Sequence, residues 1–444
     1  MTAPRNLTIF QAGARMRRGE LTAEGLVLSC LERIEAREPE VKAWVYVDRE
    51  RALNTAREMD KDARENRWHG PLHGIPIGIK DIFHVEGMET RGGTEAYEAH
   101  VAEYDAESVR RLREAGAIIL GKAVSTPFAY LGAPETRNPW NTAHTAGGSS
   151  TGSGAAVGDR MCLAALGTQT GGSTLRPAAY NGVVGFKPTL GEISTDGVLE
   201  LSWRMDHVGL IIRSTDDADL LWRVMRHGNG IDVEAHRQAM PQPVAARKPV
   251  KVWRVREFFE SESSPECTQM MEEVCGLLAD NGVEFIDRPL PAGFDDHQDV
   301  WYAILAAETA HNHRKRFADR ERFYPEKFAE LVRAGLNQKT LEYIEACRYR
   351  EWLREEAAKL LGDVDAAIMP TAPAPPPDPS TTGNPMFLTP WTLCGIPALS
   401  IPAAVAPGNL PLGVQLITGA GGDEALVQIG KWCENLIGFD KIPE

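Results

Sequence analysis

Residues 147–189 read GGSSTGSGAAVGDRMCLAALGTQTGGSTLRPAAYNGVVGFKPT, two loops rich in glycine and hydroxyl side chains around one apolar run. Glycine lets a backbone approach a ligand closely and adopt conformations that other residues avoid. Successive N–H groups in such turns can form a nest that binds an anion. A flexible Gly/Ser linker would not enclose an apolar strand or repeat its Gly-Gly-Ser. We therefore interpret the stretch as a site built largely from backbone.

Familiar motifs do not account for these loops. Residues 148–152 have the spacing of a nucleophile elbow, but turn residues rather than a strand precede them. Val157 stands where a dinucleotide fingerprint needs its third glycine, and the chain contains neither a phosphate P-loop nor an S-x-x-K motif. What remains is a hydroxyl nucleophile that needs a base.

The candidate bases are His144, His207 and Lys80. Neither histidine has an obvious carboxylate to orient it, and a lone histidine beside a loop is more often a structural hydrogen bonder. Lys80 ends the apolar run GIPIGIK, where burial would lower its pKa towards neutrality. A neutral lysine can act as a general base. A lysine at a strand end is ordinarily a surface residue, but the two Gly–Ser loops favour the catalytic interpretation.

Composition excludes several other classes of protein. The net charge of -14 over 444 residues argues against a nucleic-acid-binding surface, which needs clustered positive charge. The first residues contain no apolar signal segment, and no run is long enough to span a membrane, so we expect a cytoplasmic protein. The seven cysteines are dispersed, which predicts reduced thiols, and no His/Cys cluster suggests a metal site.

Short apolar runs alternate with helical stretches along the chain, which predicts an α/β fold with a covered sheet. We expect helix over 21–65, mostly helix over 214–281, and a long amphipathic helical block over 297–362. A proline-rich connection follows at 371–379. The expected strands cover residues 75–83, 117–124, 162–167, 183–186, 208–212, 250–255, 397–403 and 412–417.

The Lys80 segment and residues 147–189 resemble the two hallmark blocks of the amidase signature family. Residues 202–209, 395–397 and 411–415 resemble later blocks of that family, so the resemblance covers most of the chain. It implies a single α/β/α domain over 1–444, with a large twisted mixed sheet covered by helices. The catalytic core would span about 66–215 with strands returning at 363–444, under a helical cover at 290–360.

By position, the resemblance makes Ser173 the nucleophile, Ser149 the bridging serine and Lys80 the base. It also implies a cis peptide bond between Gly148 and Ser149. The oxyanion would be held by backbone N–H groups of Thr170, Gly171, Gly172 and Ser173. This chemistry needs no cofactor and no metal.

The chain departs from the family pattern around the nucleophile. Gln169 replaces the usual aspartate, and an arginine falls at Arg176, three residues after Ser173, as in malonamidase-like members. Arg176 either binds a substrate carboxylate or pairs with a structural acid near the loop. Residues 127–130 replace a commoner acidic segment. We name Arg176, Tyr130, Gly148 and Gln169 as candidate substrate contacts.

The expected activity is hydrolysis of small amides, anilides or carbamates through an acyl-enzyme, with esters and urethanes as side substrates. One alternative is the glutaminase subunit of a tRNA-dependent amidotransferase, against which Gln169 and the position of Arg176 count. Another is a catalytically inactive binding protein of the same fold, although all three triad positions are filled. The expected partner is a small-molecule amide or carbamate, with no nucleic acid or membrane. A homodimer is compatible with the sequence.

Overall fold

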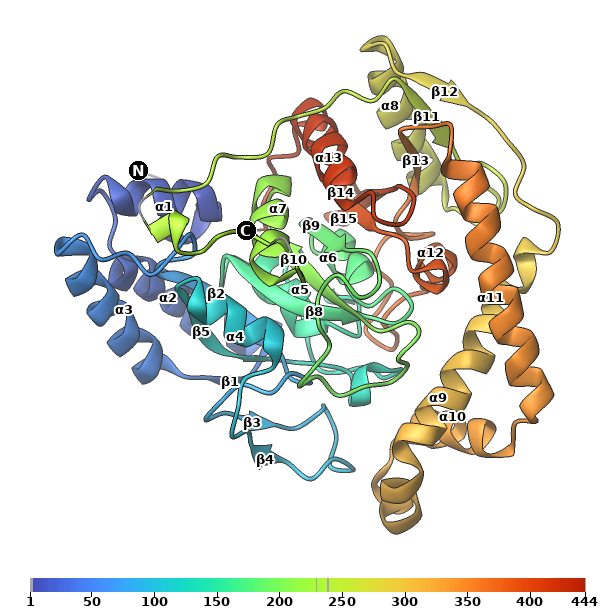
Figure 1. Cartoon of the computed structure of the whole chain (residues 1–444), viewed down its shortest axis with the longest axis horizontal. Helices are drawn as coiled ribbons and strands as arrows, with labels where there is room; N and C mark the ends of the chain where they lie inside the picture. The colour runs from blue at the N-terminus through green and yellow to red at the C-terminus, as the bar shows by residue number, and fades with distance from the viewer. Residues whose placement is uncertain (1–2, 229, 238, 444) are drawn as a thin grey trace.

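The computed structural model describes residues 3–228, 230–237 and 239–443, and its centre is an 11-stranded mixed sheet (Figure 1). In spatial order the strands are β1 (Trp44–Val47), β5 (Ala117–Ala123), β2 (Ile75–Lys80), β8 (Ala164–Gln169), β10 (His207–Ile212), β9 (Val184–Lys187), β14 (Ala398–Ala406), β15 (Leu410–Ile417), β13 (Ala366–Pro370), β11 (Lys251–Arg254) and β12 (Glu284–Ile286). The predicted single domain with a large mixed sheet is confirmed, and the late strands join the same sheet as the early ones.

Thirteen α-helices in the described part of the chain are interleaved with the strands and surround the sheet. They are α1 (Ile9–Arg17), α2 (Ala23–Val41), α3 (Arg49–Arg64), α4 (Glu107–Glu114), α5 (Thr151–Gly158), α6 (Leu175–Tyr180), α7 (Thr215–Met225), α8 (Pro265–Asp280), α9 (His297–Arg320), α10 (Glu326–Asn337), α11 (Thr340–Leu361), α12 (Thr389–Cys394) and α13 (Asp423–Ile437). Two short hairpins, β3 (Glu89–Thr90) with β4 (His100–Val101) and β6 (Arg137–Asn138) with β7 (Asn141–Thr145), lie outside the main sheet.

The central strands are buried along their whole length, which explains their continuous apolar sequences. Every residue of β2, β8, β10 and β15 is buried. β2 runs parallel to both of its neighbours, β5 and β8, whereas β10 runs antiparallel to β8. The ends of β2 and β8 therefore point to the same edge of the sheet, where the functional residues gather.

The prediction of an unbroken helical region over 21–65 is wrong. The left-handed Lys42 (φ 53°) ends α2, and β1 follows before α3 begins. The strand is aromatic and β-branched, Trp-Val-Tyr-Val, and such residues fit a sheet edge better than a helix. Strands β12 and β13 were also missed, and most of 226–250 is irregular rather than helical among the described residues.

Helices α9, α10 and α11 lie together along one side of the molecule, away from α1–α3 (Figure 1). Their positions match the predicted helical block at 297–362. The indole of Trp301 on α9 reaches the core, because its Nε1 donates a hydrogen bond to the carbonyl of Thr170 at 2.8 Å. In the described part of the chain, no helix is long and apolar enough to cross a membrane.

Candidate active site

Lys80 stands at the end of β2, the third strand from one edge of the sheet, and its side chain is fully buried. Its Nζ lies 2.8 Å from Ser149 Oγ and 2.8 Å from Thr168 Oγ1, which β8 supplies. Burial lowers the pKa of Lys80 well below its ordinary value, and the negative charge of Asp206 opposes this only in part. A lysine whose pKa is lowered in this way more readily takes the neutral form, which has a lone pair to accept a proton.

The loop that precedes α5 fixes the position of Ser149. The Gly148–Ser149 peptide bond is cis, as the family resemblance implied, and Ser149 is buried. Glycine is required at Gly148, because an added Cβ would lie 2.6 Å from the Thr382 methyl group. The amide of Ser150 donates to the carbonyl of Ser173 at 3.2 Å, which ties this loop to the second Gly-Gly-Ser turn.

The turn at 170–173 directs all its carbonyl oxygens into the protein, where each accepts a hydrogen bond. Trp301 Nε1 donates to the Thr170 carbonyl at 2.8 Å, and Thr392 Oγ1 donates to the Gly171 carbonyl at 2.6 Å. The Arg176 amide donates to the Gly172 carbonyl at 3.1 Å, and the Ser150 amide donates to the Ser173 carbonyl at 3.2 Å. Among the described residues, the N–H groups of Gly171, Gly172 and Ser173 have no acceptor. A peptide turn whose carbonyls are all engaged in this way can present these N–H groups to an anion.

Asp206 holds the other side of the turn. It accepts hydrogen bonds from Thr170 Oγ1 at 2.6 Å and from the amides of Leu201 and Ser202. Burial raises the pKa of Asp206 to about 6, although these hydrogen bonds lower it. Asp206 therefore couples the turn at 170–173, the loop at 200–206 and the electrostatic environment of Lys80.

The side chain of Gln169, predicted as a candidate substrate contact, forms its hydrogen bonds within the protein. Its amide oxygen accepts hydrogen bonds from the amides of Thr174 and Leu175, and its nitrogen donates to Thr392 Oγ1 at 3.0 Å. The side chain is fully buried. Gln169 thus accepts hydrogen bonds from amides at the N-terminus of α6.

Arg176 is also enclosed by the protein, in a way that neither predicted role described. Its guanidinium donates to the carbonyl oxygens of Gly148 and Gly383, both at 2.7 Å, and to Thr382 Oγ1 at 3.4 Å. No acid pairs with it among the described residues, and burial lowers its pKa to about 10. Arg176 braces the bridging-serine loop against residues 382–383.

Tyr130 and Phe128 connect the region after β5 with the helical cover. Phe128 stacks on Tyr324 with ring centroids 5.3 Å apart, and it packs edge-on against His313. The Tyr130 ring meets Phe328 at 5.9 Å. With Trp301 bound to the turn at 170–173, these contacts bring the helical cover to the site.

The two histidines considered as bases have structural partners. His144 Nδ1 lies 2.7 Å from the Pro376 carbonyl, and His207 Nδ1 lies 2.6 Å from the Met205 carbonyl. Neither lies within hydrogen-bonding distance of Ser173 or Ser149 among the described residues. Of the three candidate bases, Lys80 is the one that contacts Ser149. No group of three potential metal ligands gathers in the described part of the chain.

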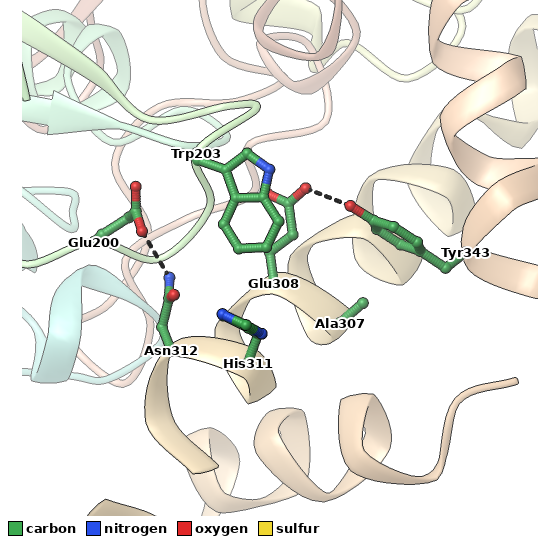
Figure 2. A pocket seen from close by; sticks show the side chains of 7 residues that line it. All are labelled: Glu200, Trp203, Ala307, Glu308, His311, Asn312 and Tyr343. Atoms are coloured by element: carbon green, nitrogen blue, oxygen red, sulfur yellow. Dashed lines mark hydrogen bonds between the residues drawn. The ribbon is translucent and has the colours of Figure 1, made fainter. Parts of the chain in front are cut away.

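A pocket of about 600 Å³ opens beside the loop at 200–206 (Figure 2). It is lined by Glu200, Trp203, Ala307, Glu308, His311, Asn312 and Tyr343. The buried carboxylate of Glu308 accepts hydrogen bonds from Ser202 Oγ at 2.6 Å and from Tyr343 OH at 2.8 Å. Glu308 thereby fixes the loop that carries Asp206, and no predicted triad residue lines this pocket.

Comparison with known proteins identifies the family of the chain. The family model Amidase matches residues 25–427. AmiD of Mycobacterium bovis, a protein named as an amidase, is 32% identical over 452 residues, covering 98% of this chain and 95% of its own. A glutamyl-tRNA(Gln) amidotransferase subunit of Geobacter metallireducens is 30% identical, covering 95% of this chain and 96% of its own. A crystal structure of an amidase superposes with a TM-score of 0.87 at 31% identity, covering 97% of this chain and 99% of that one. The chain belongs to the amidase signature family.

Proposed function

We propose that this protein hydrolyses C–N acyl bonds with Ser173 as the nucleophile, Ser149 as the bridging serine and Lys80 as the base. The observation that carries the proposal is the 2.8 Å separation between the buried Lys80 Nζ and Ser149 Oγ. A buried lysine without a carboxylate in contact is costly to keep charged, and proton transfer needs its neutral form.

In the proposed reaction, Lys80 Nζ accepts the proton of Ser149 Oγ, which accepts the proton of Ser173 Oγ. Ser173 Oγ bonds to the carbonyl carbon, and the oxyanion is held by the free N–H groups of the 170–173 turn. The relay returns a proton to the leaving nitrogen as the C–N bond breaks. Water then attacks the acyl-enzyme, releasing the acid and restoring the Ser173 hydroxyl.

We propose a neutral substrate, namely a small amide, anilide or carbamate. The cation nearest to the nucleophile in sequence is Arg176, whose two Nη groups donate to the carbonyls of Gly148 and Gly383. The aromatic side chain of Trp301 reaches the site from the cover, and Tyr130 packs against the cover from the region after β5. Such aromatic walls suit an uncharged acyl group or amine. The same acyl chemistry accommodates esters and urethanes.

The glutaminase component of an amidotransferase remains the second candidate, because one such relative is 30% identical over nearly the whole chain. That function requires partner subunits and glutamine as the amide. Purification from the native host by affinity to this chain, followed by a glutaminase assay, separates the two. Stable partner subunits together with selective hydrolysis of glutamine would replace our proposal.

The direct test is a kinetic screen of neutral amides, anilides, carbamates, esters and dicarboxylic monoamides, combined with labelling by a fluorophosphonate. We expect turnover of a neutral amide or carbamate and a single label that peptide mapping locates on Ser173. Absence of both turnover and label in the folded protein would favour the inactive binding protein instead. A label on any other serine would contradict the assigned nucleophile.

A further inference from the structure

Arg160 and Arg213 line a small cavity near the C-terminal ends of α5 and β10. Arg160 lies two residues after α5, and Arg213 directly follows β10. The cavity has a volume of about 70 Å³. It is lined by Arg160, Gly182, Val183, Arg213, Ile401, Pro402, Glu434, Phe439, Asp440 and Lys441.

The two guanidinium groups have more donors than the protein provides acceptors. The guanidinium of Arg160 forms no hydrogen bond or ion pair with any described residue, and its Nε is buried. Arg213 donates one Nη to the carbonyl of Arg5, but its Nε and its other Nη are buried without an acceptor. Buried donors of charged groups are costly to leave unsatisfied, so the pair favours an acceptor that the protein itself does not supply.

The acids around the cavity do not neutralise the pair. The carboxylate of Asp159, next to Arg160, accepts hydrogen bonds from Arg33 at 2.6 Å and Arg37 at 3.2 Å. Glu434 accepts from the amide of Thr215, and burial raises its pKa to about 7. It therefore carries only part of a charge at neutral pH.

The remaining charged groups stand at the mouth of the cavity. Asp440 and Lys441 are both exposed, and Asp440 forms no ion pair with a described residue. Inside, the charges of Arg160 and Arg213 repel each other, which adds to the effect of burial and lowers the pKa of Arg160 to about 9. The cavity thus has a positive interior and a mouth open to solvent.

We propose that Arg160 and Arg213 bind one small inorganic oxyanion, of the phosphate or sulfate class, in this cavity. Guanidinium groups offer paired N–H donors that match the oxygens of such an anion. A cavity of about 70 Å³ admits one tetrahedral oxyanion and excludes larger organic phosphates.

This site is separate from the proposed catalytic centre. Ser150 caps the opposite end of α5, and Asp206 directly precedes β10. The anion would therefore hold together the far ends of α5 and β10, together with the C-terminal residues 439–441 that line the cavity. It does not depend on whether Ser173 is the nucleophile.

The test is a titration of the full-length protein with inorganic phosphate in a chloride-free buffer of constant ionic strength. Isothermal calorimetry should give one phosphate per chain, and the thermal midpoint should rise by about 2–4 °C at saturation. Arg160→Gln and Arg213→Gln should each weaken binding by at least about tenfold. The exposed Arg64→Gln is the matched control and should bind like the wild type.

A separate measurement guards against variants that simply unfold. Without phosphate, Arg160→Gln should unfold at the same temperature as the wild type or higher, because the substitution removes an unpaired buried charge. Equal phosphate affinity in wild type and both variants would overturn the proposal, as would no binding to the wild type. Chloride that binds and stabilises as strongly as phosphate would overturn the assignment to an oxyanion.

Discussion

Lys80 Nζ lies 2.8 Å from Ser149 Oγ in a part of the core that solvent does not reach. The strand β2 carries the lysine, and the loop before α5 carries the serine, so two segments 69 residues apart meet at one edge of the sheet. Thr168 Oγ1 completes the environment of the amine at 2.8 Å. The proposed relay and its pH dependence both follow from this contact.

The first prediction concerns the proposed nucleophile. Ser173→Ala should lower kcat by about 10⁴–10⁶-fold, because no other hydroxyl can form the acyl-enzyme. Steady-state kinetics on the best substrate of the screen and fluorophosphonate labelling measure the loss. Ser261→Ala changes an exposed serine and is the control, which should keep both activity and label. Retention of wild-type kcat by Ser173→Ala would refute the assignment.

The second prediction concerns Lys80 and pH. The wild-type rate should fall as the pH drops through the lowered pKa of Lys80, because only the neutral amine accepts a proton. Lys80→Met should lose about 10²–10⁴-fold in kcat and lack this acid limb. A flat profile in the wild type, with chemistry shown to limit the rate, would argue against a lysine base.

The same pKa change affects stability. The unfolded chain keeps an ordinary lysine with a pKa near 10.5, whereas folded Lys80 releases its proton at lower pH. Between those two values the unfolded state binds more protons, so the free energy of unfolding should rise with pH. Denaturant titrations of wild type and Lys80→Met at several pH values measure the difference. Identical slopes for the two proteins would show that Lys80 stays charged.

Thr168 is the subject of the third prediction, as a positioning residue. Thr168→Val removes the hydroxyl at 2.8 Å from Lys80 Nζ with little change in shape. We expect a loss of about 1 kcal/mol in transition-state stabilisation, roughly fivefold in kcat, with KM little changed. Thr168→Ser should restore the rate, and the acid limb of Thr168→Val should shift. A loss that serine does not rescue would indicate a packing effect instead.

The sequence predicted the central strands because they are continuous apolar runs, buried on both faces. It could not predict β1, since four residues between two charged helices leave no room for a pattern. β13 was hidden by its short sequence Ala-Ala-Ile-Met-Pro next to the proline-rich connection. Such edge and late strands are defined by their neighbours rather than by their own sequence.

For the site, the motifs that resemble the amidase signature family paired Lys80 with Ser149, and the two side chains are in contact in the structure. They could not identify partners that come from distant segments, such as Trp301 and Thr392 on the carbonyls of the oxyanion turn. Glu308, which fixes the Asp206 loop, lies on α9 without any motif around it. The signal that the sequence offered for Glu308 was an acidic residue among the apolar positions of an amphipathic helix.

The last prediction concerns Arg176, for which the sequence left substrate binding and scaffolding open. Its guanidinium donates to the carbonyls of Gly148 and Gly383, so truncation should disturb the loop that carries Ser149 rather than remove a substrate contact. Arg176→Ala should therefore lower kcat for a neutral anilide and for a monoamide of a dicarboxylic acid by the same factor. Two lost hydrogen bonds from a charged group suggest about 3–6 kcal/mol of lost stabilisation of this loop.

Arg176→Lys is the informative companion, because one ammonium cannot reach both carbonyls with the paired geometry of a guanidinium. It should recover only part of the rate, again equally on both substrates. A KM that rises for the acidic substrate alone, with kcat preserved on the anilide, would instead mean that Arg176 turns towards the substrate in the complex. In that case an acidic amide would replace the neutral substrate proposed above.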